Sequence, residues 1–276
     1  MINEIDIAYS PCPNDTYIFS GWAQNKIKSM CRLNSHLYDV QALNTFALNE
    51  QFPITKLSTF CFGKVLDHYS LLPVGAAIGY NCGPKIVAKT DYELKDISNL
   101  KIAFPGKDTT AFLLFVTLFG MPNDPLFCRY DEILDLIEQG KVDVGIIIHE
   151  TRFTFSARGY KEICDLGTLF FDKYQCPTPL GVIACSRKIS DEKKYEIIKS
   201  IQASLDFANK YPEKAMDYVL FQSQEKDVNI VKKHIDLYVT KDTMDLSESG
   251  KDAILRLFET ARKLHLLPES SKSLSL

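Results

Sequence analysis

The chain has 276 residues, of which 46% are hydrophobic and 24% are charged, a composition typical of globular proteins. This length can bury a large core, and it predicts one or two α/β domains. The 32 basic and 35 acidic residues leave a net charge of -3, so no basic excess is available to neutralise a phosphate backbone. Nucleic acid is therefore not an expected partner.

The sequence also disfavours secretion, membrane insertion and a zinc centre. The start, MINEIDIAY, lacks the basic and apolar stretches of a secretory signal, and no segment has the roughly 18 consecutive apolar residues of a membrane span. We therefore expect a cytoplasmic protein without membrane insertion. The eight cysteines are scattered and form no C-x-x-C pair, which predicts reduced thiols and no metal site. The sequence carries no signal for an oligomeric state.

The first ninety residues alternate between predicted strands and predicted helices. Strands are expected at residues 5–9, 36–40 and 54–58, and helices at 15–25, 41–51 and 60–68. Strands that alternate with helices pair in parallel, so a parallel sheet is expected here. The following apolar segment, 71–90, is interrupted by glycine and proline, which favours extended chain with tight turns.

A second series of strands and helices begins near residue 101. It comprises strands at 101–104 and 142–148 and helices at 109–119 and 130–139. A strand at 85–89 is expected to leave the first lobe and one at 180–185 to return, after which the chain is helical from residue 191.

These segments predict an α/β protein with a two-lobed, type II periplasmic-binding-protein-like fold, mostly parallel sheets and a hinge cleft. The first lobe is expected to comprise residues 1–89 together with a helical segment, 188–276, and the second lobe to be inserted at 90–187. A single doubly wound sheet is the alternative. In either fold, ligands bind at the carboxyl ends of the strands.

Two loops that join a strand to a helix are candidates for ligand contact. The loop SPCPNDT combines two stiffening prolines with polar groups, including Asn14, around a helix start. In the loop PGKDTTA, the hydroxyl and N–H groups of Thr109, Thr110 and Ala111 lie at a positive helix end and could hold a carboxylate. Helix capping is the alternative interpretation of both loops.

A third candidate segment, Lys56, Leu57 and Ser58, closes the third predicted strand, so Ser58 is expected to face the same cleft. Leu57 could offer only its backbone groups. The alternative for Ser58 is that its side chain caps the following helix.

His149 follows a nearly continuous apolar run, VDVGIII, which is typical of a strand buried on both faces of a parallel sheet. An imidazole there, with an intrinsic pKa of about 6.5, could act as a general base, although a structural histidine is the alternative. Glu150 and Arg152 could orient the ring or bind substrate, or they could form a surface ion pair. The other histidines have plain structural interpretations, at a strand start or in amphipathic helices: His36, His68, His234 and His265.

Taken together, these segments resemble the 1,4-dihydroxy-6-naphthoate synthase family of the futalosine route to menaquinone. The resemblance rests on SPCPNDTYIF (10–19), GYNCGP (79–84), PGKDTTA (105–111), VDVGIIIHETRF (142–153) and PLG (179–181). It implies a periplasmic-binding-protein fold and a lyase that converts cyclic dehypoxanthine futalosine, a small-molecule carboxylate, into 1,4-dihydroxy-6-naphthoate without metal or organic cofactor.

The same resemblance implies roles for individual residues. His149 falls on the position of the family's proton acceptor, and residues 56–58 and 109–111 fall on its substrate-contacting segments. The chain departs from the family's usual pattern after Ser58, where it has TFCF, and before Cys82, where it has Tyr80 and Asn81. These departures concern the wall of the first lobe and not the base.

Two other functions are alternatives to this one. Chorismate dehydratase of the same pathway shares the fold but lacks the SPCPNDT loop and the His-Glu pair. A cytoplasmic protein that binds a small anion without catalysis would keep the cleft and need no base, so loss of His149 would leave its ligand affinity largely intact.

Overall fold

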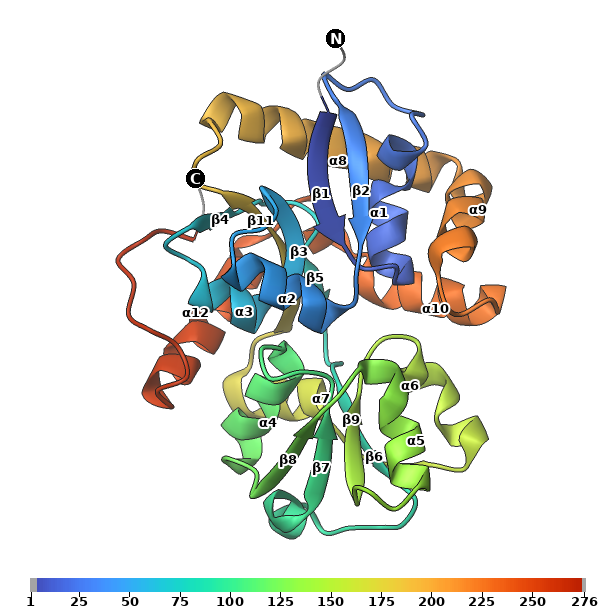
Figure 1. Cartoon of the computed structure of the whole chain (residues 1–276), viewed down its shortest axis with the longest axis vertical. Helices are drawn as coiled ribbons and strands as arrows, with labels where there is room; N and C mark the ends of the chain where they lie inside the picture. The colour runs from blue at the N-terminus through green and yellow to red at the C-terminus, as the bar shows by residue number, and fades with distance from the viewer. Residues whose placement is uncertain (1–3, 275–276) are drawn as a thin grey trace.

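The computed structural model describes residues 4–274, and Figure 1 shows that they form two α/β lobes joined by two connections. The six-stranded sheet of the first lobe contains β1 (Glu4–Tyr9), β2 (Arg32–Leu37), β3 (Ile54–Ser58), β4 (Tyr69–Leu71), β5 (Ala77–Gly79) and β11 (Thr178–Ser186). The five-stranded sheet of the second lobe contains β6 (Lys85–Ala88), β7 (Lys101–Phe104), β8 (Asp124–Phe127), β9 (Val144–Ile147) and β10 (Lys161–Asp165).

Helices cover both sheets. Those of the first lobe are α1 (Pro13–Ala23), α2 (Val40–Leu48), α3 (Thr59–Lys64), α8 (Asp191–Lys210), α9 (Pro212–Gln222), α10 (Val228–Tyr238), α11 (Lys241–Met244) and α12 (Glu248–Lys263). Those of the second lobe are α4 (Thr110–Phe119), α5 (Ile133–Glu138), α6 (Thr151–Thr154) and α7 (Leu166–Tyr174), with short 3₁₀ turns at Leu94–Asn99, Tyr130–Glu132 and Ser156–Arg158. No helix among the described residues is both long and apolar enough to cross a membrane.

The strand pairing differs from the expected mostly parallel sheets, and that part of the prediction is wrong. β1 pairs in parallel with β2 and β3, and β7 with β8 and β9. Every pairing of β6, β10 and β11 described here is antiparallel. Parallel neighbours need a crossover connection, whereas β6 and β11 enter their sheets from the other lobe and run in the opposite direction. Both sheets are therefore mixed.

Each of the two crossing strands also belongs to the lobe opposite to the one expected from the sequence. β6 pairs only with strands of the second sheet, β9 and β10, although residues 85–89 were assigned to the end of the first lobe. β11 pairs with β3, β4 and β5 of the first sheet, although residues 180–185 were assigned to the inserted lobe. Hydrophobic patterning marks a strand but not the sheet that it joins.

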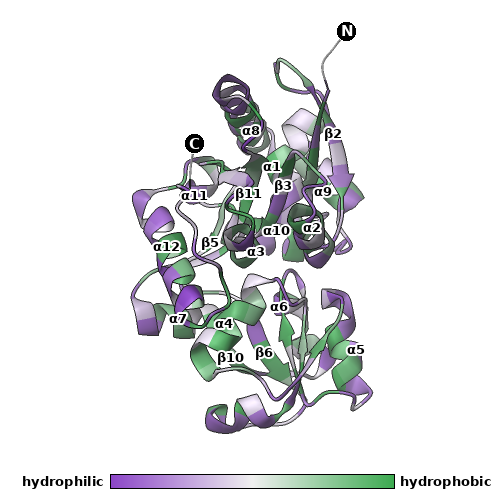
Figure 2. Ribbon diagram, turned by 60° about the vertical axis from the view of Figure 1, so that its left-hand side comes forward, coloured by the Kyte–Doolittle hydropathy of each residue, from purple (hydrophilic) through white to green (hydrophobic). Residues whose placement is uncertain are grey.

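Helix α1 is buried along almost its whole length because it is packed between the first sheet and helices α8, α9 and α10. Gly21 permits this packing, since a Cβ atom there would lie 2.9 Å from the Phe207 side chain of α8. Helix α8 buries Ile197, Ile201 and Leu205, which are four residues apart and share one face. Figure 2 shows the result: α8 is largely hydrophilic, whereas α4, buried over most of its length, is mostly hydrophobic.

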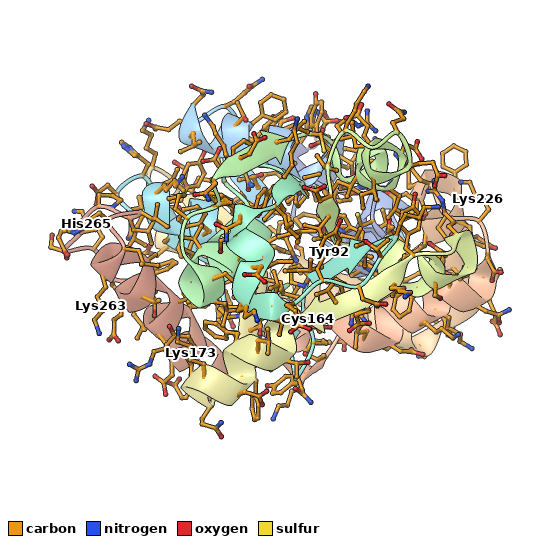
Figure 3. The ribbon with its side chains drawn as sticks, turned by 90° about the horizontal axis from the view of Figure 1, so that it is seen from below. Tyr92, Cys164, Lys173, Lys226, Lys263 and His265 are labelled. Carbon is orange, nitrogen blue, oxygen red and sulfur yellow. The ribbon has the colours of Figure 1, made fainter. Side chains whose placement is uncertain are left out.

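The largest apolar cluster extends across both lobes. It joins Phe60 and Phe62 of the first lobe to Phe104, Phe112 and Phe115 of the second. Charged side chains such as Lys173, Lys226 and Lys263 lie at the periphery (Figure 3). The inner ends of the two lobes therefore meet through apolar contact, which positions the loops at the carboxyl ends of the strands against one another.

We predict that Phe115→Ala lowers the free energy of unfolding by about 3–5 kcal/mol, the usual cost of removing a fully buried aromatic ring. Phe115 is fully buried, and its ring centroid lies 5.2 Å from that of Phe104. Urea unfolding followed by circular dichroism measures the loss. Phe221, which is 80% exposed, is the matched control, because Phe221→Ala should cost less than about 0.5 kcal/mol.

Candidate active site

A cavity of about 110 Å³ lies between the two lobes. All eight residues expected at the site line it: Asn14, Lys56, Leu57, Ser58, Thr109, Thr110, Ala111 and His149. The remaining lining residues are Ser10, Asp15, Val40, Leu43, Ala77, Pro84, Ile148, Leu180, Gly181, His234 and Tyr238. The structure thus brings the candidate segments of both lobes together around one space.

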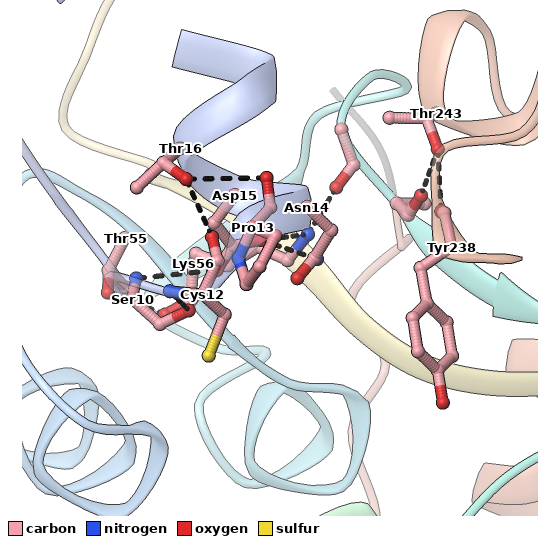
Figure 4. A network of polar contacts seen from close by, with 12 residues as sticks. Ser10, Cys12, Pro13, Asn14, Asp15, Thr16, Thr55, Lys56, Tyr238 and Thr243 are labelled. Carbon is pink, nitrogen blue, oxygen red and sulfur yellow. Dashed lines mark hydrogen bonds and ion pairs between the residues drawn. The ribbon is translucent and has the colours of Figure 1, made fainter. Parts of the chain in front are cut away.

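Asp15, in the first turn of α1, is the centre of the polar wall on the first lobe (Figure 4). Its Oδ2 accepts hydrogen bonds from the Ser10 hydroxyl at 2.8 Å and the Ser10 N–H at 3.3 Å. Its Oδ1 accepts one from Asn14 Nδ2 at 2.9 Å and lies 3.1 Å from Lys56 Nζ. Lys56 Nζ also donates to the Gly75 carbonyl at 2.6 Å, so the ammonium of Lys56 is held inside the wall.

This network also orients Asn14 and His234. Because Asn14 donates through Nδ2 to Asp15, its Oδ1 must face the other way, where it lies 3.0 Å from His234 Nε2. An amide oxygen only accepts, so His234 Nε2 carries a proton and donates it. Burial lowers the pKa of His234 well below its ordinary value, which keeps the ring neutral.

His234 was not expected at the site, and neither was Tyr238, which lies one turn later on α10. Both line the cavity, and their ring centroids lie 4.8 Å apart. On a surface helix they occupy the buried face, together with Val231 and Ile235, so the helical pattern alone predicts only burial. The partner of His234 in the site is Asn14, which is 220 residues away in the sequence. Only the fold brings these two residues together.

On the second lobe, the expected threonines use their hydroxyls for structure. Thr109 caps α4, since its Oγ1 accepts from the Phe112 N–H at 3.3 Å, as the capping alternative proposed. Thr110 Oγ1 donates to the Leu180 carbonyl at 2.9 Å and accepts from the Phe60 N–H at 3.2 Å. What these residues offer the cavity is therefore the start of α4, where the first N–H groups have no partner within the helix.

Ser58 behaves differently from its capping alternative. Its side chain makes no capping bond to α3, and its Oγ instead accepts from Asn44 Nδ2 at 3.0 Å. Asn44 Oδ1 in turn accepts from the Ser58 N–H at 2.9 Å. Since the Ser58 oxygen accepts the hydrogen bond from Asn44, the proton of the hydroxyl remains available to donate to a ligand oxygen.

His149 stands two residues beyond the end of β9, with a left-handed backbone (φ 58°) that is uncommon outside glycine. Its Nδ1 lies 3.2 Å from Cys12 Sγ, and its Nε2 is inaccessible to solvent and has no hydrogen-bond partner among the described residues. The ring forms an edge-to-face pair with Tyr130, and the two ring centroids are 4.8 Å apart. Burial lowers the pKa of His149 from 6.5 to about 4, so the ring is neutral near pH 7.

The neighbours of His149 are buried and do not form a surface ion pair. Arg152 bonds to Asp165 at 3.1 Å and to the Tyr238 hydroxyl at 2.6 Å, and it therefore links α6 of the second lobe to α10 of the first. Glu150 is 8% exposed, and burial raises its pKa from 4.5 to about 7.

Cys12, His149 and Glu150 bring possible metal-ligand atoms within 4.8 Å of one another. Such a set could hold a thiophilic cation such as Zn²⁺, a combination that the search for C-x-x-C pairs could not detect because the residues come from two segments. The same side chains also form an ordinary contact between a thiol and an imidazole, so the cluster by itself does not identify a metal centre.

Asp108 holds the two lobes together at the other end of the cavity. Its carboxylate pairs with Lys64 at 2.7 Å and accepts from Gln41 at 2.9 Å, and its carbonyl accepts from Asn44 at 3.2 Å. These three partners belong to the first lobe and Asp108 to the second. Asp108 therefore ties the two lobes to one another across the cleft.

We predict that Glu150→Gln stabilises the protein at pH 8 but not at pH 5. Because the folded pKa is raised, the native state binds more protons than the unfolded state between about pH 4.5 and 7, so Glu150 costs stability as the pH rises through this window. Glutamine mimics the protonated form and should add about 2–3 kcal/mol more at pH 8 than at pH 5.

Urea unfolding at the two pH values measures this difference, with the exposed Glu248→Gln as the matched control. An equal effect of Glu150→Gln at both pH values would show that the carboxyl is ionised throughout.

Comparison with known proteins extends this description. Residues 5–263 match the family described as menaquinone biosynthesis. The chain is 35% identical over 268 residues to 1,4-dihydroxy-6-naphthoate synthase of Thermus thermophilus, covering 97% of each chain. It is 33% identical over 269 residues to the protein of the same name from Streptomyces coelicolor, covering 96% of this chain and 95% of that one.

Solved structures give the same picture. A protein from Archaeoglobus fulgidus, 29% identical, has a TM-score of 0.91 and covers 96% of this chain and 98% of its own. A Candida albicans protein described as having the generic periplasmic binding protein fold has a TM-score of 0.67 at 13% identity, with 98% and 92% covered. The predicted periplasmic-binding-protein-like fold is thus confirmed, and the chain belongs to the menaquinone biosynthesis family, with close similarity to its 1,4-dihydroxy-6-naphthoate synthases.

Proposed function

We propose that the protein is a lyase that converts cyclic dehypoxanthine futalosine into 1,4-dihydroxy-6-naphthoate, with His149 as the proton acceptor. Membership of the menaquinone biosynthesis family and the names of the two relatives support the pathway. The observation that carries the proposal is the unpartnered Nε2 of a neutral His149, a residue that lines the cavity between the two lobes. A neutral imidazole is the form that accepts a proton.

The rest of the cavity suits a carboxylate substrate. The N–H groups of Thr110 and Ala111 lie at the start of α4, where a helix favours negative charge. The Ser58 hydroxyl can donate to a second ligand oxygen. A carboxylate held at α4 would leave the bicyclic part of the substrate within reach of the other lining groups.

The chemistry requires few groups. His149 removes a proton from the substrate, the sugar-derived fragment leaves, and the bicycle gains aromatic stabilisation. Closure of the lobes excludes water from the reacting intermediate, a condition that the interlobe contacts of Asp108 and Arg152 support.

We also propose that the protein works in the cytoplasm. All eight cysteines are free thiols, a state that reducing compartments maintain.

The test of the function is direct: the purified protein is incubated with cyclic dehypoxanthine futalosine, and dihydroxynaphthoate is sought by mass spectrometry. We predict that His149→Gln lowers kcat by about a hundredfold or more, the usual effect of losing a general base. Glutamine suits this position, because Gln175 already adopts the same left-handed backbone.

His265→Gln is the matched control, since His265 is exposed and has φ 57°. Its turnover should equal that of the parent. The alternative of a binding protein would be supported by two results together. The parent protein would bind the substrate without turning it over, and His149→Gln would still bind it.

For the substrate contact, we predict that Ser58→Ala raises KM by about five- to a hundredfold with little change in kcat, because a buried ligand oxygen loses its donor. Steady-state kinetics measure the two constants. Ser190→Ala, which removes the cap of α8, should lower thermal stability and leave KM unchanged. An unchanged KM in Ser58→Ala would remove Ser58 from the substrate contacts.

A further inference from the structure

The contact between Cys12 and His149 crosses the cleft. Cys12 precedes α1 in the first lobe, and His149 follows β9 in the second. Cys12 is the residue before the first turn of α1, yet its side chain makes no capping bond to the helix. It is 3% exposed, and its sulfur lies 3.2 Å from His149 Nδ1. The sulfur therefore faces the ring and not the helix.

The ring's single proton has two alternative positions. In the first arrangement the thiol donates to Nδ1, and the proton of the neutral ring lies on Nε2. In the second, Nδ1 carries the proton and donates it to the sulfur, so that Nε2 keeps a lone pair. A thiol can take either role, as a weak donor or a weak acceptor.

The surroundings of Nε2 distinguish the two arrangements. Nε2 is inaccessible and has no partner among residues 4–274. An unpaired buried N–H is rarer in folded proteins than an under-satisfied acceptor. The first arrangement leaves the ring N–H at Nε2 unpaired. The second leaves a lone pair at Nε2 and the thiol S–H of Cys12 without an acceptor, which costs less because S–H is a weak donor. The second arrangement is favoured, and it is also the one in which Nε2 can accept a proton.

We infer that Cys12 is a positioning residue for His149: its sulfur accepts the Nδ1–H hydrogen bond and thereby leaves the lone pair on Nε2. The use of that lone pair as a base rests on the proposed function, but the proton position does not. Since the two residues belong to different lobes, the ring acquires its partner only when the cleft is closed. Closure would then do more than exclude water, because it would also select the reactive tautomer.

The proton position is tested by long-range ¹H–¹⁵N correlation spectra of the histidine rings. These spectra distinguish a protonated ring nitrogen from a bare one, and the His149 signals are assigned by their loss in His149→Gln. We expect Nδ1–H and bare Nε2 in the parent, and a mixture of both tautomers in Cys12→Ala. Nε2–H in the parent would overturn the inference, whether or not the protein turns over the proposed substrate.

Kinetics of the same variants test the consequence. We expect Cys12→Ala to lower kcat about tenfold with little change in KM, a smaller loss than the ten-thousandfold seen when a carboxylate orients a catalytic histidine, because sulfur is a weak acceptor. Cys12→Ser supplies a hydroxyl acceptor and should recover most of kcat. Cys185→Ala, at a buried thiol in β11, is the matched control and should keep the parent kcat.

Two results would overturn the positioning role. One is a parent-like kcat in Cys12→Ala. The other is an equally low kcat in Cys12→Ala and Cys12→Ser together with a substrate adduct on Cys12 in the parent, which would make the thiol a nucleophile. Thermal unfolding of each variant shows whether a loss of kcat comes from a loss of fold.

Discussion

The carboxylate of Asp15 is the group on which the site depends. It is 3% exposed, and a buried carboxylate is costly unless it is paired and hydrogen-bonded. Ser10, Asn14 and Lys56 supply those partners, and each is thereby fixed at the edge of the cavity. Lys56 is held further by the Gly75 carbonyl, and Asn14 passes its orientation to a histidine of α10. One buried charge thus organises three separate segments of the first lobe.

The second lobe completes the site through contacts that exist only when the lobes are together. Asp108, Arg152, Thr110 and His149 each bond to a residue of the first lobe. The apolar cluster that spans both lobes contributes the non-directional part of this association. The polar contacts fix the relative orientation of the two lobes, because a buried hydrogen bond is lost when its partner moves away.

Much of the site could be predicted from the sequence because its residues stand where strands end. Ser58 is the last residue of β3, His149 follows β9 and Thr110 begins α4, so the rule that ligands bind at the carboxyl ends of strands brings them together. His234 was not predicted as a site residue because it lies within a helix whose pattern indicates only burial. The antiparallel pairing of β6 and β11 was not predicted because strand direction depends on pairing with residues far along the chain. Local pattern predicted many of the elements, although the strand expected at 36–40 lies at Arg32–Leu37 and neither β8 nor β10 was expected. The partners of the crossing strands required the fold.

The left-handed backbone of His149 has a consequence for any attempt to make this protein more heat-resistant. A residue other than glycine in that conformation costs about 1 kcal/mol or more. Glycine at position 149 would relieve this backbone cost, but it would also remove the imidazole and its packing against Tyr130. Thermostable variants should instead be sought at positions remote from the cleft, with turnover as a second criterion.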